Sequence, residues 1–223
     1  MRIVALLFAI TLAACTGPAA NVASGDAAPR FAVDPFWPKA LPNNWLLGQV
    51  SGIAVDPQDH VWIIQRPRTL SPDERGATLN PPRSKCCAPA PAVIEFDRDG
   101  GVVQAWGGPG QGYDWPSNEH GIRLDPKGNV WLGGNGNEDG MLLKFSREGK
   151  FLLQIGKRGA SQGSLDTANF NNPADIQVYP PTNEVFVADG YVNRRVMVLD
   201  ADTGDRKSTC LNSSHTDISR MPS

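Results

Sequence analysis

The chain has 223 residues, with 21 lysines and arginines against 23 aspartates and glutamates and a formal net charge of −2. This balance argues against a basic nucleic-acid-binding surface and against an acidic tail, so partners have to be inferred from individual sites. A hydrophobic share of 40%, together with 23 glycines and 19 prolines, indicates a globular protein that is rich in turns.

The first residues have the pattern of an export signal. Arg2 precedes an apolar run that is too short to span a bilayer and that ends in "LAAC" at Cys15. This ending resembles the bacterial lipobox, in which the cysteine is lipidated. We therefore expect a signal peptide over 1–14, a lipid on Cys15, a flexible tether over 15–30 and a bacterial outer-membrane lipoprotein facing the periplasm or the exterior. An ordinary cleaved signal with an incidental cysteine is the alternative.

Three segments of the chain share one pattern. "GIAVDPQDHVWII" starts at Gly52, "GIRLDPKGNVWLG" at Gly121 and "DIQVYPPTNEVFVAD" at Asp175. Each has alternating apolar residues, a Pro-containing turn and a second apolar run, which is typical of a β-hairpin. Each is followed by two more strand-like runs around the turns "DRDGG", "SREGK" and "DADTG". The pattern predicts a repeating unit of four antiparallel strands.

The spacing of the repeat favours a β-propeller. The copies start 69 and 54 residues apart, whereas a four-stranded blade takes about 40–45 residues, so each copy carries an insertion. The largest is "RPRTLSPDERGATLNPPRSKCCAPAP", which we read as a loop. A two-sheet sandwich is the alternative, but it does not predict a threefold motif. Trp62, Trp131 and Phe186 share one repeat position and are expected in the core.

The end of the chain departs from the repeat. A closed six-bladed propeller needs roughly 240–270 residues, whereas residues 31–206 supply about three blades. The final "KSTCLNSSHTDISRMPS" is serine-rich and resembles translated sequencing-adapter DNA. We therefore expect an all-β fold that is an incomplete propeller over 31–206, followed by a non-native or disordered tail over 207–223. A genuine disordered tail is the alternative, and Cys210 is assigned no function.

Polar side chains at strand ends are the candidates for chemistry. His120 precedes a predicted strand, Arg66 ends one, and Tyr191 follows another. Because loops at one face of a propeller meet around its central channel, these three are expected to share a rim. Cys86 and Cys87 are adjacent; they form a vicinal disulfide, stay as thiols or bind a metal, and we favour a disulfide in a surface loop.

A family resemblance rests on the same segments. "SGIAVDPQDHVWIIQR", "EHGIRLDPKGNVW" and "PADIQVYPPTNEVFVADGYVNRRVMVLD" resemble blades of the catalytic core of peptidyl-α-hydroxyglycine α-amidating lyase, a six-bladed propeller of NHL-type repeats. The "DGYxNxR" element is the most specific part. The resemblance implies a lyase that cleaves peptidyl-α-hydroxyglycine to a peptide amide and glyoxylate, with zinc and calcium as cofactors and a peptide or small molecule as substrate.

The resemblance also implies roles for single residues. His120 matches one of three imidazole ligands of zinc, Arg66 and Tyr191 match the catalytic side chains, and the backbone carbonyls of Ile53 and Ile122 match calcium ligands. The other two histidines belong to later blades, so this chain alone is expected to be inactive. The cysteines that pair near the "DGY" loop in the animal enzymes are also missing, since Val192 stands there.

Two other functions remain open from the sequence. The first is a non-catalytic NHL propeller that binds a protein or a glycan at its rim. The second is a calcium-dependent hydrolase similar to lactonases, although the acidic channel ligands that it needs are not evident. Three neutral imidazoles leave zinc an open position for a substrate hydroxyl, a tyrosine is a suitable base, and an arginine binds a carboxylate in two-point contact.

Overall fold

The structure, a computed structural model, describes residues 30–211. The chain divides into two units, Met1–Pro35 and Phe36–Ser223. The described part of the first unit, residues 30–35, forms no helix or strand. The predicted signal peptide, the lipidation site at Cys15 and all but the last residue of the predicted tether lie outside the described residues.

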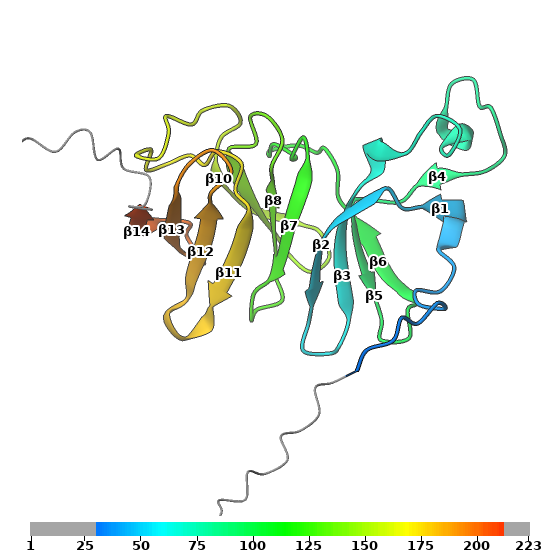
Figure 1. Cartoon of the computed structure of the whole chain (residues 1–223), viewed down its shortest axis with the longest axis horizontal. Helices are drawn as coiled ribbons and strands as arrows, with labels where there is room; N and C mark the ends of the chain where they lie inside the picture. Colours follow the sequence, from blue (N-terminus) through cyan, green and yellow to red (C-terminus); the bar gives the residue numbers. More distant parts are fainter. Residues whose placement is uncertain (1–29, 212–223) are drawn as a thin grey trace, which may run out of the picture. The chain divides into compact units, whose positions relative to one another are not determined.

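Three four-stranded antiparallel sheets make up most of the second unit (Figure 1). Within each sheet the strands lie side by side in the order in which they follow one another along the chain. Blade 1 consists of β2 (Gln49–Val55), β3 (Val61–Arg66), β5 (Val93–Phe96) and β6 (Val102–Trp106). Blade 2 consists of β7 (Glu119–Leu124), β8 (Val130–Gly134), β9 (Met141–Phe145) and β10 (Phe151–Gly156). Blade 3 consists of β11 (Asp175–Tyr179), β12 (Glu184–Asp189), β13 (Arg195–Asp200) and β14 (Arg206–Leu211).

The first strands of the blades contact one another. β7 of blade 2 contacts both β2 of blade 1 and β11 of blade 3, so the first strands of the three blades are neighbours. Four-stranded sheets that follow sequence order, with their first strands together, are the arrangement of a β-propeller. The predicted all-β fold, an incomplete propeller of about three blades, is confirmed. The sandwich alternative is wrong for residues 30–211, because their long strands form three successive four-stranded sheets and not two packed sheets.

Apolar side chains hold neighbouring blades together. One cluster joins blades 1 and 2 and includes the buried side chains of Trp62, Ile64 and Met141. A second cluster joins blades 2 and 3, with Trp131 packed among residues of blade 3 such as Val187. The indole rings at this repeat position thus fill the space between one blade and the next, and burial of such large rings is the main stabilising term.

Phe186 differs from its two counterparts. Trp62 and Trp131 are fully buried, as predicted, but Phe186 is 37% exposed. The physical reason is its place in the repeat: the first two rings are covered by the following blade, and the described residues place no blade beyond blade 3. The prediction that Phe186 is a core residue is therefore wrong for the described part of the chain.

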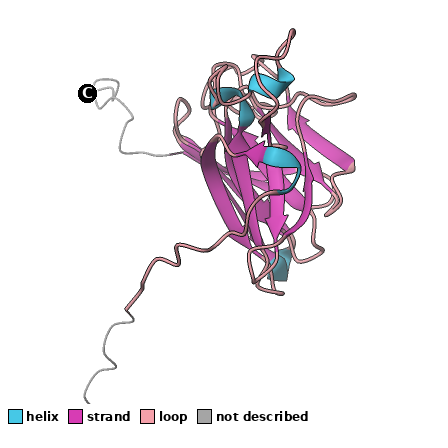
Figure 2. Cartoon of the chain, turned by 90° about the vertical axis from the view of Figure 1, so that its right-hand side faces the viewer, coloured by secondary structure: helices cyan, strands magenta, loops and turns pink. Residues whose placement is uncertain are grey.

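The long insertion between β3 and β5 has some regular structure. It contains two 3-10 helices, η2 (Pro67–Thr69) and η3 (Gly76–Thr78), and the short strand β4 (Ala88–Pro89). β4 pairs in parallel with β1 (Trp45–Leu46), which follows η1 (Pro42–Asn44). Figure 2 shows how these short helices lie outside the strands; the fourth, η4 (Pro180–Thr182), is in the turn between β11 and β12. The prediction of a pure loop is therefore wrong in detail.

The last described strand crosses the predicted boundary at residue 206. β14 pairs with β13 from Arg195↔Leu211 to Leu199↔Arg206, so it completes blade 3. Its side chains are mostly exposed, and backbone hydrogen bonds to an edge need no apolar pattern. The aperiodic sequence therefore did not predict it. The non-native origin of residues 207–223 stays a prediction, and residues 212–223 lie outside the described part.

The described residues include no helix that is long and apolar enough to cross a membrane.

Candidate functional site

His120 lies in a β-bulge at the start of β7. In the pairing of β7 with β8, Glu119 faces Gly134 and Gly121 faces Gly133, so His120 between them has no partner. Blade 1 repeats this irregularity, where Ser51 lies between the paired residues Val50 and Gly52. An extra residue in one strand turns its side chain out of the regular alternation, and bulges of this kind are frequent next to active sites. The imidazole of His120 contacts a residue of blade 3.

Tyr191 of blade 3 meets this imidazole. The Tyr191 hydroxyl lies 3.0 Å from His120 Nε2, and the two rings meet edge to face with centroids 5.4 Å apart. Tyr191 follows β12 and is 55% exposed, so one side of the pair faces solvent. The other ring nitrogen, His120 Nδ1, is buried without a hydrogen-bond partner among the described residues. Nε2 is therefore the ring nitrogen that faces Tyr191.

Arg66 of blade 1 reaches the same place. It is the last residue of β3, and its Nε donates a hydrogen bond to the backbone oxygen of Glu119 at 2.8 Å. Its terminal nitrogen also donates to Gln49 Oε1 at 3.2 Å. The guanidinium thus contacts the residue next to His120. The structure brings Arg66, His120 and Tyr191, from three different blades, to one rim, as the strand ends predicted.

The surroundings of His120 favour its neutral form. Burial lowers the pKa of the imidazole below its ordinary value, and the positive charge of Arg66 lowers it further, while the carboxylate of Asp175 opposes the shift. A neutral imidazole is the form that ligates a metal or accepts a proton. The electrostatics therefore suit either role at neutral pH.

This shift predicts a pH dependence of stability. Because the pKa of His120 is lower in the folded chain than in the unfolded chain, the unfolded chain binds the proton more readily, and stability falls as pH drops through the ordinary range near 6.5. We expect His120→Gln to flatten the decline in the urea midpoint between about pH 7.5 and 5.5. Above about pH 8 the two profiles should run parallel. An unchanged slope in the variant would contradict the shift.

Asp139 shapes the segment that leads to His120, and the sequence analysis missed it. The side chain is fully buried, and its carboxylate accepts hydrogen bonds from the backbone N–H groups of Ser117 at 2.8 Å, Asn118 at 3.0 Å and Gly136 at 2.8 Å. A carboxylate satisfied by several N–H groups fixes a loop firmly. Asp139 is a positioning residue for the start of β7. Its own segment gives no signal of this role, because two of its three partners, Ser117 and Asn118, lie 22 and 21 residues away in the sequence.

The predicted calcium ligands lie on adjacent strands. Ile53 is on β2 and Ile122 on β7, and a methyl group added at Gly52 would lie 2.7 Å from the backbone oxygen of His120 and 3.3 Å from Ile122 Cγ2. The two strands are therefore in close contact at the predicted position. Ile53 is 61% exposed at its side chain, whereas Ile122 is buried. Calcium binding by their carbonyls stays a prediction.

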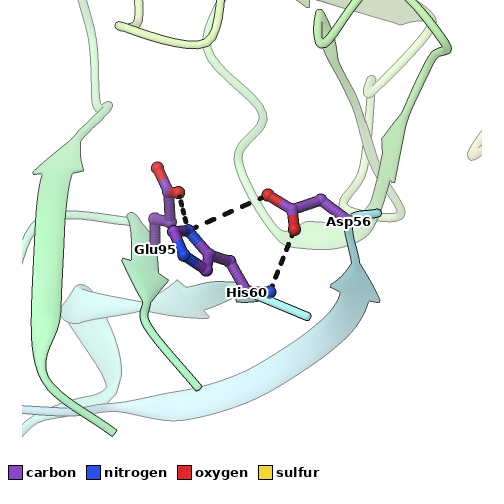
Figure 3. Close-up of side chains that lie close together, drawn as sticks. All are labelled: Asp56, His60 and Glu95. Atoms are coloured by element: carbon purple, nitrogen blue, oxygen red, sulfur yellow. Dashed lines mark hydrogen bonds and ion pairs between the residues drawn. The ribbon is translucent and has the colours of Figure 1, made fainter. Parts of the chain in front are cut away.

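A different group of side chains could hold a metal ion. The ligand atoms of Asp56, His60 and Glu95 lie within 4.8 Å of one another (Figure 3). His60 precedes β3 and Arg66 ends it, so this group is at the end of blade 1 opposite to Arg66. His60 Nδ1 is 2.6 Å from Glu95 Oε1, and the backbone N–H of His60 donates to Asp56 Oδ1 at 2.9 Å. His120 does not belong to this group, so within residues 30–211 it has no set of three ligands around it. The described residues supply one of the three imidazoles that the resemblance implies.

A guanidinium already occupies the acidic part of this group. Arg147 of blade 2 donates to Asp56 Oδ2 at 2.7 Å and also to Glu95 Oε1, and it stacks over the Trp62 ring with its Cζ 5.0 Å from the centroid. Both carboxylate side chains are fully buried. The cation that neutralises them in this structure is therefore a side chain of the next blade.

Two of the cysteines are paired and one is free among the described residues. The structure pairs Cys86 with Cys87 in a disulfide within the insertion of blade 1. Cys210 is a free, exposed thiol on β14.

The chain is similar in sequence to known amidating enzymes. No family model matches the chain. It is 30% identical over 190 residues to peptidyl-glycine alpha-amidating monooxygenase of Mus musculus, covering 76% of this chain and 17% of that protein. It is 28% identical over 159 residues to a probable peptidyl-alpha-hydroxyglycine alpha-amidating lyase of Caenorhabditis elegans, covering 70% and 42%. A catalytically inactive virginiamycin B lyase from Staphylococcus aureus superposes with a TM-score of 0.44 and 15% identity over 78% of this chain and 44% of that one. The chain thus spans about a sixth of the first of these curated relatives and about two fifths of the second. Over some three quarters of its own length it is similar to amidating monooxygenases and lyases.

Proposed function

We propose that the protein is a lyase-type propeller that cleaves the N–C bond of a peptidyl-α-hydroxyglycine and releases a peptide amide and glyoxylate. The observation that carries the proposal is the meeting of Tyr191 and His120 across 3.0 Å, with Arg66 bonded to the residue beside His120. These are the three residues to which the family resemblance assigns roles in this reaction, and they come from three blades. The similarity to amidating enzymes supports the same reaction class.

Each rim residue has a chemical role in this proposal. The Arg66 guanidinium binds the substrate carboxylate in two-point contact, which fixes the reacting carbon. The Tyr191 oxygen, in its phenolate form, takes the proton of the substrate hydroxyl as the carbonyl of glyoxylate forms. The electron pair of the breaking N–C bond passes to the amide nitrogen, and the same proton is returned there. The reaction is then balanced without an oxidant or a reductant.

The proposal includes two metal ions that the relatives' resemblance implies. His120 would hold zinc through Nε2, in place of the contact with the Tyr191 hydroxyl, and its lowered pKa favours the neutral imidazole that coordinates a metal. Bound zinc with an open position lowers the pKa of a coordinated hydroxyl. The remaining ligands would come from residues outside 30–211. The carbonyls of Ile53 and Ile122 would contribute to a calcium site.

We also propose that the protein is exported and anchored by a lipid at Cys15. This would place the enzyme at the bacterial cell envelope.

Glyoxylate release tests the reaction. The longest natural chain that contains this sequence should release glyoxylate from an N-acylated hydroxyglycine peptide, and metal analysis should find zinc. Tyr191→Phe should lower kcat by about 10²–10⁴-fold because it removes the proton acceptor. Tyr179→Phe is the matched control, since Tyr179 is 49% exposed on β11 and outside the rim. If no zinc is found and no glyoxylate is released, the proposed reaction is wrong and a binding propeller remains.

A further inference from the structure

An open pocket lies between blades 1 and 2. Its volume is about 750 Å³, and we call it the proline pocket. The walls are largely apolar, with the rings of Trp45 and Trp115 and the prolines at positions 67, 89 and 91. Sites that bind small apolar groups are typically concave, lined in this way and furnished with few polar atoms.

The insertion of blade 1 builds one wall of the pocket. Residues from η2 to β4 line it, among them Pro67, Thr78 and Pro89. In blade 2 the equivalent connection between the second and third strands covers only residues 135–140. The pocket is therefore a feature that the repeat itself does not provide.

Two residues of the pocket wall are chain neighbours of the candidate active-site residues, and Arg66 Nε donates to the backbone oxygen of one of them, Glu119, at 2.8 Å. Pro67 follows Arg66 directly, and Glu119, on the opposite side of the pocket, precedes His120. Consecutive Cα atoms are about 3.8 Å apart. A peptide whose reacting end lies between Arg66 and His120 therefore reaches the pocket with the residue next to that end.

Two charged side chains mark the polar part of the pocket. Glu119 is 5% exposed; its Oε1 accepts a hydrogen bond from Trp115 Nε1 at 2.9 Å, and its Oε2 has no hydrogen-bond partner among the described residues. Arg68 lies 3.9 Å from Oε2 and is tied to Ser117 O at 2.8 Å. A buried carboxylate oxygen without a donor is costly, so a ligand that brings an N–H group is favoured here.

We propose that the proline pocket binds the apolar side chain of the residue that precedes the reacting glycine of a peptide, and that Glu119 receives a backbone N–H of the same peptide. This inference rests on the proposed function for the position of the glycine. It assigns the substrate class: peptides with a large apolar residue, aromatic above all, in the penultimate position.

Binding of unreactive peptides tests the pocket separately from the reaction. N-acetyl-Phe-Gly and N-acetyl-Gly-Gly carry no hydroxyl at the glycine, so neither is a lyase substrate. Isothermal titration of the protein should show a Kd about 10-fold to 100-fold lower for N-acetyl-Phe-Gly, as expected from burial of an aromatic side chain. Equal Kd values for the two peptides would overturn the proposal, even if glyoxylate release is found. A clear difference without any glyoxylate release would keep the pocket and remove the reaction.

A variant that fills the pocket locates the binding. Thr78 is an exposed lining residue whose hydroxyl donates only locally, to Arg75 O at 2.9 Å. Thr78→Trp should abolish the preference for N-acetyl-Phe-Gly and leave the Kd of N-acetyl-Gly-Gly unchanged, which also shows that the variant is folded. Thr182→Trp is the matched control, because Thr182 is exposed in η4 and donates to Glu184 at 2.7 Å. Retention of the preference in Thr78→Trp would place the aromatic side chain elsewhere and overturn the assignment.

Discussion

Replacing Arg147 with alanine is expected to lower the free energy of unfolding by about 3–5 kcal/mol. The guanidinium neutralises two fully buried carboxylates, Asp56 and Glu95, across the boundary between blades 2 and 1. Removing it leaves two negative charges facing each other in a site with little water. Urea denaturation at neutral pH measures the loss, and a change below about 1 kcal/mol would show that the bridge contributes little.

The chain provides a matched control for this variant. Arg98 holds the same position in the "DRDGG" turn of blade 1 that Arg147 holds in the "SREGK" turn of blade 2, but Arg98 is exposed. Arg98→Ala should change the free energy of unfolding by no more than about 0.5 kcal/mol, because the described residues place no blade against it. The comparison separates the bridge from any general effect of losing an arginine in this turn.

The same variant tests how the acidic group could hold a metal. Without the guanidinium, the ligand atoms of Asp56, His60 and Glu95 still lie close enough for one ion. Zinc should therefore raise the Tm of Arg147→Ala more than that of the unsubstituted protein. If the unsubstituted protein gains as much, zinc and the guanidinium do not compete for this site.

Acid should weaken this bridge. Burial by itself raises the pKa of Asp56, but hydrogen bonds from Arg147, from the backbone of His60 and from Trp62 outweigh it and hold the pKa below its ordinary value. A depressed carboxylate pKa gives stability that is present above the ordinary value, near 3.8, and is lost as pH falls through the folded-state pKa. Arg147→Ala should show a smaller loss in this acidic window.

Replacing Gly52 with alanine is expected to cost about 1–3 kcal/mol. The added methyl group would lie 2.7 Å from the backbone oxygen of His120 and 3.0 Å from Ile64 Cγ2. Neither a backbone oxygen nor a fully buried isoleucine can easily give way, so β2 and β7 have to separate. Because 1 kcal/mol corresponds to about 2–4 °C for a chain of this size, thermal unfolding measures the effect directly.

Gly121 is the repeat equivalent of Gly52 and serves as its control. A methyl group there meets only Ala174 O, at 3.7 Å, which is an ordinary contact. Gly121→Ala should leave the Tm unchanged or raise it slightly, since alanine loses less backbone entropy on folding. Equal losses in both variants would mean that the close approach of β2 to His120 does not limit the packing of the blades.

The hairpins and their repetition could be predicted from the sequence because they depend on local patterns. Alternating residues around the turn "DPKGN" fix a strand pair without reference to the rest of the chain. The common rim of Arg66, His120 and Tyr191 could be predicted in the same way. In an antiparallel hairpin the start of the first strand and the end of the second strand lie at the same edge, and these edges of the blades form one face of the propeller.

The remaining features depend on partners that are far apart in the sequence. The bridge from Arg147 to Asp56 spans 91 residues, and the turn sequence around Arg147 differs little from that around Arg98. The bulge at His120 depends on how β7 pairs with β8, and the apolar pattern alone does not determine this pairing to the exact residue. The exposure of Phe186 depends on what lies beside its blade and not on its own segment.

The bulge has a consequence for how such a protein can change over time. His120 and Ser51 occupy the same position in two blades, where the residue has no cross-strand backbone partner. The side-chain contacts differ, since Ser51 Oγ donates a hydrogen bond to Ile64 O of the paired strand at 3.3 Å. His120 instead contacts Tyr191 of the next blade. Blade 1 carries a small hydroxyl there and blade 2 an imidazole, which means that ligands or reactive groups can be gained or lost blade by blade while the scaffold persists.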